Sequence, residues 1–422
     1  MNPVLQQIQV TFRFPVHFTV GVFELSNPLL RETIAAGIGV GAAAAAGVGV
    51  EIPGSSEAKA TVAPRRPARV LVVIDRGVLR DNRQLPAAIK SYCADSPDVM
   101  TLVGRPVILP GGEKVKNLPR YTREILRAIN DAGLCRHSYL IAVGGGALLD
   151  VAGYAAATAH RGIRLIRVPT TVLSQDDSGV GVKNGVNAFG KKNYLGVFAP
   201  PFAVINDFNF LATLSDRDWR SGISEAVKVA LIKDAAFFDF LEEHAARLAG
   251  RDPASMEQII RRSAALHCAH IATSGDPFEQ GSSRPLDFGH WAAHKLEHLT
   301  NYRMRHGEAV AIGIALDSTY SFLIGSLAET GWRRILTLLR NLGLPIYSPV
   351  LERHAEVTRG LEEFREHLGG ELTVMLLKGI GRAYDVNEVD PELVARSIRM
   401  LQEWIRGAGE HEVYAKPERV AG

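Results

Sequence analysis

The hydrophobic pattern changes character about halfway along the chain. In the first half, β-branched runs alternate with segments of helical period, as in ARVLVVID (68–75), YTREILRAINDAGL (121–134) and YLIAVGGG (139–146). Strands that alternate with helices are typical of parallel βαβ units. In the second half, apolar residues recur at helical spacing in one segment after another. The pattern predicts an α/β domain with a parallel sheet over 1–205 and an all-α domain over 206–422.

The N-terminal region has two patterns of its own. Residues 4–25 alternate apolar and polar side chains on either side of a proline, which predicts a β-hairpin. Residues 30–69 are rich in Ala, Gly, Ser and Pro, which predicts a flexible insertion. The Ala/Gly run inside it is short and has few large apolar side chains, so we do not expect a membrane segment. The first residues lack a basic region before an apolar one and do not predict a signal peptide.

Composition narrows the class of protein. The 422 residues are 46% hydrophobic and 22% charged, enough to bury two cores. The net charge is only +3 and no basic block with interleaved aromatic residues is present, so we expect no nucleic-acid partner. Three widely spaced cysteines form no Cys-x-x-Cys motif or pairwise disulfide framework. We therefore expect a cytoplasmic protein with reduced thiols.

Three consecutive glycines follow the strand-like run LIAV. Gly144, Gly145 and Gly146 lead directly into a helical pattern. In a strand–turn–helix context, small residues let a ligand approach the backbone, and the helix N-terminus offers N–H groups to a pyrophosphate. The spacing is not that of the Gly-x-Gly-x-x-Gly fingerprint, and a merely tight turn is the alternative. We favour a dinucleotide site, in which Asp75 at the end of an earlier strand accepts a bond from a ribose hydroxyl.

A long polar segment, PTTVLSQDDSGVGVKNGVNAFGKKNYLG (169–196), has almost no helical periodicity. It predicts a loop, and long polar loops in compact enzymes are commonly functional. Its Lys183 and Lys192 supply positive charge and its Asn193 supplies an amide donor, which suits the binding of a phosphate group.

The helical half carries a second set of chemical groups. Glu225 and Lys228 are spaced i, i+3, which fits either an intrahelical ion pair or a metal ligand beside a substrate contact. His290 and His294 are spaced i, i+4, but the pair lacks the glutamate of the zinc-protease motif. Glu225, His290 and His306 together supply one carboxylate and two imidazoles, a usual set for a catalytic Zn²⁺. The three could equally be unrelated helix residues.

Six motifs in order give the chain a family resemblance. GGGALLDVAGY, VPTTVLSQDDSGVGVKNG, GKKN, SGISEAVK, DFGHWAAH and HGEAVAIG resemble the dehydroquinate synthase superfamily, the sugar phosphate cyclases, over about residues 75–381. The resemblance implies an NAD-binding α/β domain, a helical metal-binding domain, a homodimer, and NAD with Zn²⁺ or Co²⁺ as cofactors. It also implies a carbon–oxygen lyase that acts on a sugar phosphate by transient oxidation, phosphate elimination, reduction and an intramolecular aldol step.

The resemblance also implies roles for individual residues. The implied metal ligands are Glu225, His290 and His306. The implied catalytic residues are Asp177, Lys183, Lys228 and His294. The implied cofactor-binding residues are Asp75, Glu113, Lys116, Gly144, Gly145, Gly146, Asp150, Thr170 and Thr171. The implied substrate-binding residues are Arg161, which reaches the neighbouring subunit's site, and Lys192, Asn193, Asp287, Glu279, Arg284 and His367.

Departures from the family pattern indicate the substrate. Dehydroquinate synthases hold a substrate carboxylate with a Lys and an Arg. In this chain Ala269 stands in place of the Lys, Ser283 in place of the Arg, and Asp287 in place of a nearby Asn. Each lost charge-assisted bond weakens binding by about 1.5–3 kcal/mol, and Asp287 repels a carboxylate. RPLDFGH is similar to cyclases of sedoheptulose 7-phosphate, and the retained His294 is similar to 2-epi-valiolone synthases and EboD proteins. We expect a C7 cyclitol of the 2-epi-valiolone type as product.

Other functions remain as alternatives. 3-Dehydroquinate synthase and 2-epi-5-epi-valiolone synthase differ from the favoured reading only in substrate or product. A metal-dependent polyol dehydrogenase needs no phosphate-binding lysines, so Lys183 and Lys192 argue against it. A non-catalytic cyclase-like binding protein would not need the Glu/His/His set. We expect a small-molecule sugar phosphate as partner, and neither nucleic acid nor membrane.

Overall fold

The computed structural model describes residues 3–8, 10–39, 48–49, 66–189, 191–278, 280 and 285–407. The chain divides into two compact units, Met1–Thr213 and Leu214–Gly422, called here the N-terminal and C-terminal units. The boundary that the sequence predicts, after residue 205, lies inside the last strand of the N-terminal unit. None of the helices among the described residues is both long and apolar enough to cross a membrane.

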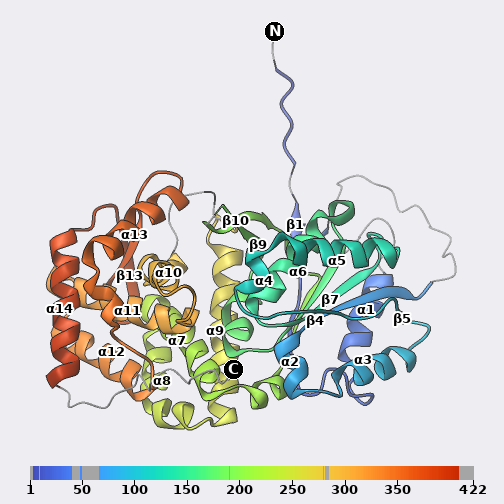
Figure 1. Ribbon diagram of the computed structural model, residues 1–422, viewed down its shortest axis with the longest axis horizontal. Helices are drawn as coiled ribbons and strands as arrows, with labels where there is room; N and C mark the ends of the chain where they lie inside the picture. The colour runs from blue at the N-terminus through green and yellow to red at the C-terminus, as the bar shows by residue number, and fades with distance from the viewer. Residues whose placement is uncertain are drawn as a thin grey trace, which may run out of the picture. The chain divides into compact units, whose positions relative to one another are not determined.

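The N-terminal unit contains a seven-stranded parallel sheet (Figure 1). The strand order is β2-β11-β8-β7-β4-β5, and β6 also pairs with β4. The predicted α/β fold with a parallel sheet is thereby confirmed. The strands are β2 (Val16–Thr19), β4 (Ala68–Asp75), β5 (Met100–Leu102), β6 (Val107–Leu109), β7 (Tyr139–Gly144), β8 (Arg164–Pro169) and β11 (Ala203–Asp207).

Helices cover both faces of this sheet. Along β4, Val72 joins one core with Leu30 and Ile89, and Val73 joins a second core with Ile125. Burial on both faces explains why β4 is a continuous apolar run without polar alternation. The helices of this unit are α1 (Leu29–Gly39), α2 (Arg76–Asp81), α3 (Leu85–Ala94), α4 (Lys114–Asn117), α5 (Pro119–Asp131) and α6 (Gly146–Thr158).

The predicted N-terminal hairpin over residues 4–25 is wrong. β1 (Thr11–Phe12) pairs antiparallel with β3 (Val48–Gly49), whereas β2 joins the large sheet in parallel beside β11. Alternating side chains predict extended backbone, but they do not identify its partner. The partner of β2 is the sheet edge formed by β11, almost 190 residues later in the sequence, as the register Val204↔Val16 shows.

The predicted insertion over residues 30–69 is wrong at both ends. Its last two residues begin β4. Residues up to 39 belong to α1, in which Leu30 and Ile34 are fully buried. Leu29 and Ile38 of the same helix also pack against this core, so the apolar face of α1 docks it on the N-terminal unit. Residues 40–47 and 50–65 lie outside the described residues.

The predicted loop over 169–196 is largely ordered secondary structure. β9 (Lys183–Ala188) and β10 (Lys191–Phe198) form an antiparallel hairpin, preceded by a π-helical turn over Ser174–Ser178. The register of the hairpin shifts between Lys191 and Leu195. The high content of Gly, Asn and Lys hid these strands, because their backbone pairing does not depend on a regular apolar face.

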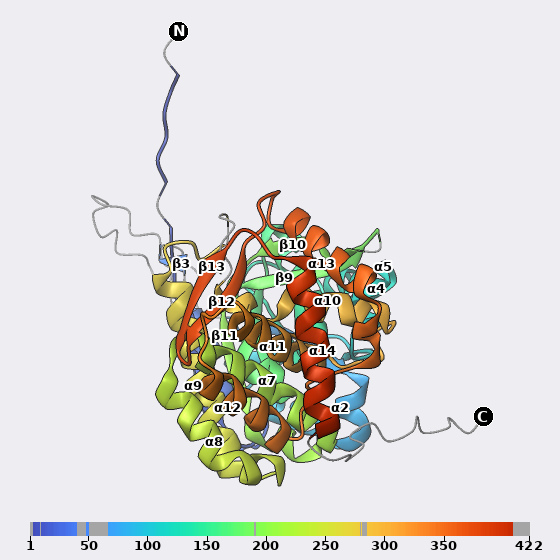
Figure 2. The same cartoon turned by 90° about the vertical axis from the view of Figure 1, so that its left-hand side faces the viewer.

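The C-terminal unit is helical, as predicted (Figure 2). It also contains a two-stranded sheet, β12 (Val374–Gly379) with β13 (Arg382–Val386), that the helical pattern did not indicate. α11 is buried along most of its length, which makes it the central helix of the unit. The helices are α7 (Asp216–Lys233), α8 (Ala235–Ala249), α9 (Pro253–Thr273), α10 (His290–Leu299), α11 (His306–Leu323), α12 (Glu329–Asn341), α13 (His354–His367) and α14 (Pro391–Gly407).

Candidate functional site

Three of the predicted cofactor residues lie together at the carboxyl edge of the parallel sheet. Asp75, Gly144 and Thr170 end or follow the adjacent strands β4, β7 and β8. Gly144 is in register with the last residue of β8, and its carbonyl accepts a bond of 3.1 Å from the Thr170 amide. Ligands of open α/β sheets bind at this edge, so the strand topology places these residues where a nucleotide is expected.

The Asp75 carboxylate lies against the glycine-rich segments. It accepts a bond of 2.7 Å from the Gly77 amide. Burial raises the pKa of Asp75, and backbone bonds from Gly77 and Gly145 oppose that shift. A Cβ on Gly111 would lie 2.2 Å from an Asp75 oxygen, so only glycine allows this approach.

The three glycines of the turn differ in whether they serve close packing or leave room for a ligand. A Cβ on Gly144 would lie 2.6 Å from Leu148 of α6, and one on Gly146 would lie 2.4 Å from Ser178 of the π-helical turn, so these two glycines allow close packing against neighbouring segments. Gly145 is the N-cap of α6 and provides no side-chain cap. The first N–H groups of α6 therefore suit an anionic ligand.

Predicted cofactor and phosphate residues meet in one polar group, called here the hairpin network: Glu113, Lys116, Asp150, Lys192 and Asn193. The Lys116 side chain is 3% exposed, and its ammonium lies 2.6 Å from an Asp150 oxygen and also donates to the Asn193 side chain. The Lys192 ammonium lies 3.7 Å from a Glu113 oxygen. The network joins α4 and α6 to the β9–β10 hairpin.

The remaining predicted residues of the N-terminal unit lie around these groups. The Thr171 hydroxyl lies 2.8 Å from the Ser174 hydroxyl at the start of the π-helical turn, which also contains the half-buried Asp177. Lys183 begins β9 and is exposed. Arg161 is exposed and has a left-handed backbone, with φ of 62°.

The C-terminal unit brings together Glu225, His290 and His306, called here the imidazole–carboxylate cluster. Their possible ligand atoms all lie within 4.8 Å of one another, although the residues come from α7, α10 and α11. Each Nε2 faces the same glutamate oxygen, at 3.6 Å for His290 and 3.5 Å for His306. Two imidazoles and a carboxylate in this arrangement fit a Zn²⁺ site with room for a further ligand.

The second nitrogen of each imidazole is already engaged. His306 Nδ1 lies 3.0 Å from a carboxylate oxygen of Glu297, and His290 Nδ1 lies 3.1 Å from the Phe288 carbonyl. Such bonds fix the ring orientation and leave Nε2 for a metal. Glu297 was not among the residues predicted from the sequence, although its positions i+7 from His290 and i+3 from His294 place it on the same helix face.

Lys228 forms an ion pair with Glu225, one of the two possibilities that the i, i+3 spacing allowed. Its ammonium lies 2.5 Å from Glu225, and both side chains are almost fully buried. Burial and then the Lys228 charge lower the pKa of His290, while Glu225 and Asp287 oppose that shift. A neutral imidazole is the form that binds a metal.

Of the other predicted residues of the C-terminal unit, the structure describes His294 and Asp287. The His294 ring centroid lies 5.6 Å from that of His290 and 6.1 Å from that of His306. Asp287 ends the short 3₁₀ turn Pro285–Asp287, directly before the His290 helix. Glu279 and Arg284 lie outside the described residues, as does the side chain of His367 at the end of α13.

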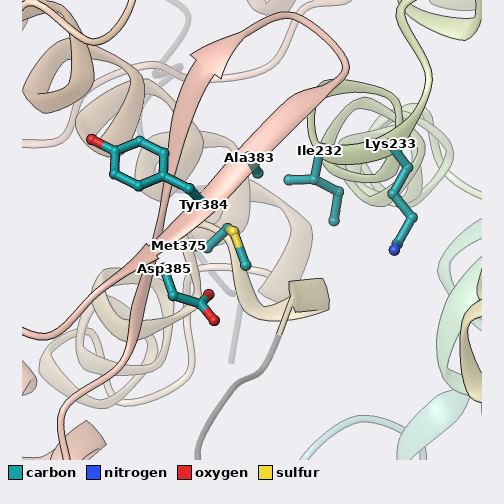
Figure 3. Close-up of a pocket in the computed structure, with 6 residues that line it drawn as sticks. All are labelled: Ile232, Lys233, Met375, Ala383, Tyr384 and Asp385. Carbon is teal, nitrogen blue, oxygen red and sulfur yellow. The ribbon is translucent and has the colours of Figure 1, made fainter. Parts of the chain in front are cut away.

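A separate cavity of about 210 Å³ lies at the C-terminal end of α7 (Figure 3). The side chains that line it come from α7 and from the β12–β13 hairpin: Ile232, Lys233, Met375, Ala383, Tyr384 and Asp385. The turn of this hairpin is fixed to α7 by a bond of 2.7 Å from the Gly381 amide to the Leu231 carbonyl. The lining includes none of the predicted site residues, so the cavity is distinct from the cluster.

Comparisons with known proteins agree with this architecture. The 3-dehydroquinate synthase N-terminal family matches residues 106–221, and the 3-dehydroquinate synthase C-terminal family matches residues 222–362. A 3-dehydroquinate synthase from Halorhodospira halophila is 34% identical over 337 residues, covering 77% of this chain and 93% of that protein. A 2-epi-5-epi-valiolone synthase from Streptomyces glaucescens is 38% identical over 283 residues, covering 67% and 72%.

Solved structures also resemble this chain over most of its length. One of them is a 2-epi-5-epi-valiolone synthase from Streptomyces hygroscopicus subsp. jinggangensis, with NAD⁺ and Zn²⁺ bound. The TM-score is 0.79 at 29% identity, and the likeness covers 96% of this chain and 99% of that one.

Proposed function

The chain belongs to the 3-dehydroquinate synthase family, and from this premise we propose that it is a sugar phosphate cyclase that acts on sedoheptulose 7-phosphate. The proposed reaction eliminates phosphate and closes a C7 cyclitol ring of the 2-epi-valiolone type. It regenerates its cofactor, which makes the enzyme a carbon–oxygen lyase rather than a dehydrogenase.

The chemistry of the donor groups supports two bound cofactors. Glu225, His290 and His306 would hold a divalent metal, Zn²⁺ or Co²⁺, and the carboxyl edge of the sheet around Asp75 and Gly145 would hold NAD⁺. When bound, the metal supplies Lewis-acid polarisation of a substrate oxygen, and the nicotinamide supplies a reversible hydride acceptor.

The chain's own residues would bind the phosphate and move protons. Lys183, Lys192 and Asn193 on the β9–β10 hairpin supply two positive charges and an amide to a phosphate group. A positive environment stabilises the dianion as it leaves. His294, one turn from His290, is suited to hold or transfer a proton at a substrate hydroxyl, because an imidazole titrates near neutral pH. We assign Lys228 and Asp177 to substrate hydroxyls.

Asp287 is the observation that carries the choice of substrate. Its charge acts on His290, where it opposes the fall in pKa that burial and Lys228 cause. A carboxylate whose charge acts on a cluster residue can accept hydrogen bonds from substrate hydroxyls, and it repels a second carboxylate. A polyol end such as that of sedoheptulose 7-phosphate suits this position better than a carboxylated substrate.

The test is phosphate release by the purified protein with NAD⁺ and Zn²⁺ or Co²⁺. We expect release from sedoheptulose 7-phosphate, and at most weak release from its carboxylated counterpart, 3-deoxy-D-arabino-heptulosonate 7-phosphate. Release from the carboxylated substrate alone would overturn the proposed substrate.

Asp287→Asn provides a matched variant, because it restores the family's amide without changing the size of the side chain. It should lose activity with sedoheptulose 7-phosphate by about tenfold, the effect of one hydrogen bond to a charged group. Its preference should shift toward the carboxylated substrate. An unchanged preference would show that Asp287 does not select the substrate.

3-Dehydroquinate synthase is the second candidate, because several relatives carry that name, including the Halorhodospira halophila protein. The same two-substrate assay separates the candidates. The epimer of the cyclitol, which distinguishes the 2-epi-valiolone from the 2-epi-5-epi-valiolone type, requires an NMR spectrum of the product.

We further propose a homodimer in which Arg161 reaches the neighbouring subunit's site. Arg161 is exposed and follows His160, and both have left-handed backbones that turn the chain sharply after α6. Mixing an Arg161→Ala variant with a Glu225→Gln variant tests this arrangement. Activity regained by mixed dimers supports a shared site, and mixing without any gain contradicts it.

A further inference from the structure

The side chain of Asn187 joins α4 to the β9–β10 hairpin. Its amide nitrogen donates to a Glu113 oxygen at 3.1 Å and to the Asn117 side-chain oxygen at 2.7 Å. Its oxygen accepts a bond of 2.8 Å from the backbone amide of Asn193. The residue is only 9% exposed. Both the nitrogen and the oxygen of this largely buried amide thus have hydrogen-bond partners.

These bonds hold the hairpin at its irregular point. Asn193 has a left-handed backbone, with φ of 54°, inside the register shift between Lys191 and Leu195. Its backbone amide is bound by Asn187 and its side-chain oxygen by Lys116. A conformation of this kind persists only where surrounding groups fix it.

We propose that Asn187 is a positioning residue for phosphate binding. It holds Asn193 and the neighbouring Lys192 in place by fixing the hairpin to α4, whose N-cap is Glu113. The inference rests on the proposed role of Lys192 and Asn193 as phosphate-binding residues. It adds a residue that does not itself touch the phosphate, and it connects that site to the segment predicted to contact the cofactor.

The hydrogen-bond pattern also predicts how substitutions at this position differ. Asn187→Ala removes all three bonds. Asn187→Asp keeps an acceptor for the Asn193 amide, but it places a carboxylate opposite the Glu113 oxygen, and two facing carboxylates repel. In the double variant with Glu113→Gln, the glutamine amide can donate to the new carboxylate at position 187 across the same 3.1 Å contact. The bond between α4 and the hairpin should therefore be restored, with its donor and acceptor exchanged.

The experiment titrates inorganic phosphate into the full-length protein by calorimetry, without substrate, and follows thermal unfolding in parallel. We expect Asn187→Ala and Asn187→Asp each to weaken phosphate binding about tenfold, the effect of losing one such fixed contact. The double variant Asn187→Asp/Glu113→Gln should bind phosphate more tightly than Asn187→Asp, with Glu113→Gln alone as reference. Asn130→Ala on α5 is the control, because Asn130 is exposed and lies outside this set of bonds, and it should bind phosphate as the wild type does.

The outcomes separate this inference from the proposed function. The inference would be overturned if Asn187→Ala bound phosphate with wild-type affinity. It would also be overturned if Asn187→Asp lost phosphate affinity and adding Glu113→Gln did not restore it, since a purely structural role predicts no such rescue. If Asn187→Ala does not fold, the Asp variant and its double variant decide. If the wild type does not turn over sedoheptulose 7-phosphate but the phosphate affinities change as expected, the inference stands and the proposed substrate fails.

Discussion

The imidazole–carboxylate cluster and the hairpin network are built in different ways. The cluster draws its three residues from three helices, each of them buried along most of its length, and Glu225 at its centre is fully buried. The hairpin network draws on the four-residue helix α4, on α6 and on a hairpin whose outer strand is mostly exposed. The cluster is therefore fixed by core packing, and the network by its own polar bonds.

This difference bears on how each group should respond to substitution. Atoms held by packed helices keep their positions when a neighbour changes, so the loss of one cluster residue should leave the other two ligands in place. Groups held by mutual hydrogen bonds lose their positions together.

The largest effect is expected for Glu225→Gln. The amide is a poor metal ligand, so bound Zn²⁺ should be lost and turnover should fall by about 10³-fold or more. NAD⁺ affinity should remain close to that of the wild type, because Asp75 and the glycine turn belong to the N-terminal unit. Metal content by mass spectrometry and NAD⁺ titration measure the two effects. The exposed Glu243→Gln on α8 is the control, and an active, metal-loaded Glu225→Gln protein would refute the ligand assignment.

A smaller effect is expected for Glu297→Gln. The glutamine oxygen still accepts from His306 Nδ1, but the negative charge that strengthens the imidazole as a ligand is lost. Zn²⁺ affinity should fall by about 10–100-fold, whereas phosphate affinity should not change. Competition with a chromogenic chelator gives the affinity. Equal Zn²⁺ affinities for the variant and the wild type would contradict a role for the negative charge of Glu297 in strengthening His306 as a ligand.

Lys116→Met tests the hairpin network. The substitution removes the ammonium that joins Asp150 to Asn193, and it should lower the free energy of unfolding by about 1–3 kcal/mol. It should also weaken phosphate binding and leave Zn²⁺ binding unchanged. Lys114→Met, an exposed neighbour on α4, controls for the loss of positive charge. Phosphate affinity that falls equally in both variants would show that only net charge matters.

The smallest effect on ligand binding is expected for Asp317, which instead affects how the free energy of unfolding depends on pH. On α11, Asp317 accepts bonds from the Gly289 amide at 3.0 Å and the Trp291 indole at 2.9 Å, and so ties α11 to the start of α10. Burial raises its pKa from 3.8 to about 7, while these two bonds oppose the shift. The folded protein thus binds this proton more tightly than the unfolded chain. The resulting stability is complete below pH 3.8 and is lost as pH rises toward 7.

Asp317→Asn resembles the protonated carboxyl at every pH, so it should flatten this dependence. Urea unfolding of the metal-free protein at pH 5 and pH 8 tests the prediction. The wild type should lose more of its unfolding free energy between these two values than the variant does. Parallel losses in the two proteins would show that Asp317 does not titrate in this range.

The sequence predicted the parallel sheet because burial on both faces leaves a clear signal, a continuous apolar run in β4 and β7. It did not predict the pairing of β2 or the β9–β10 hairpin. Strand partners depend on contacts between distant segments, and the polar hairpin has no periodic apolar face.

The candidate site shows a similar division. Family motifs named Glu225, His290 and His306, which are far apart in sequence, and the structure brings them together. Glu297 could have been found from its helical spacing. Asn187 could not, because its partners come from a different segment and only the folded hairpin brings the three side chains into contact.

The most direct test of the account is a product analysis with sedoheptulose 7-phosphate, the metal and a small amount of NAD⁺. We predict one phosphate and one C7 cyclitol for each sugar consumed, over many turnovers, with no net NADH. Accumulation of NADH in proportion to the sugar consumed would show a dehydrogenase, and phosphate release from the carboxylated heptulosonate alone would show a 3-dehydroquinate synthase. Either result would contradict the proposed function.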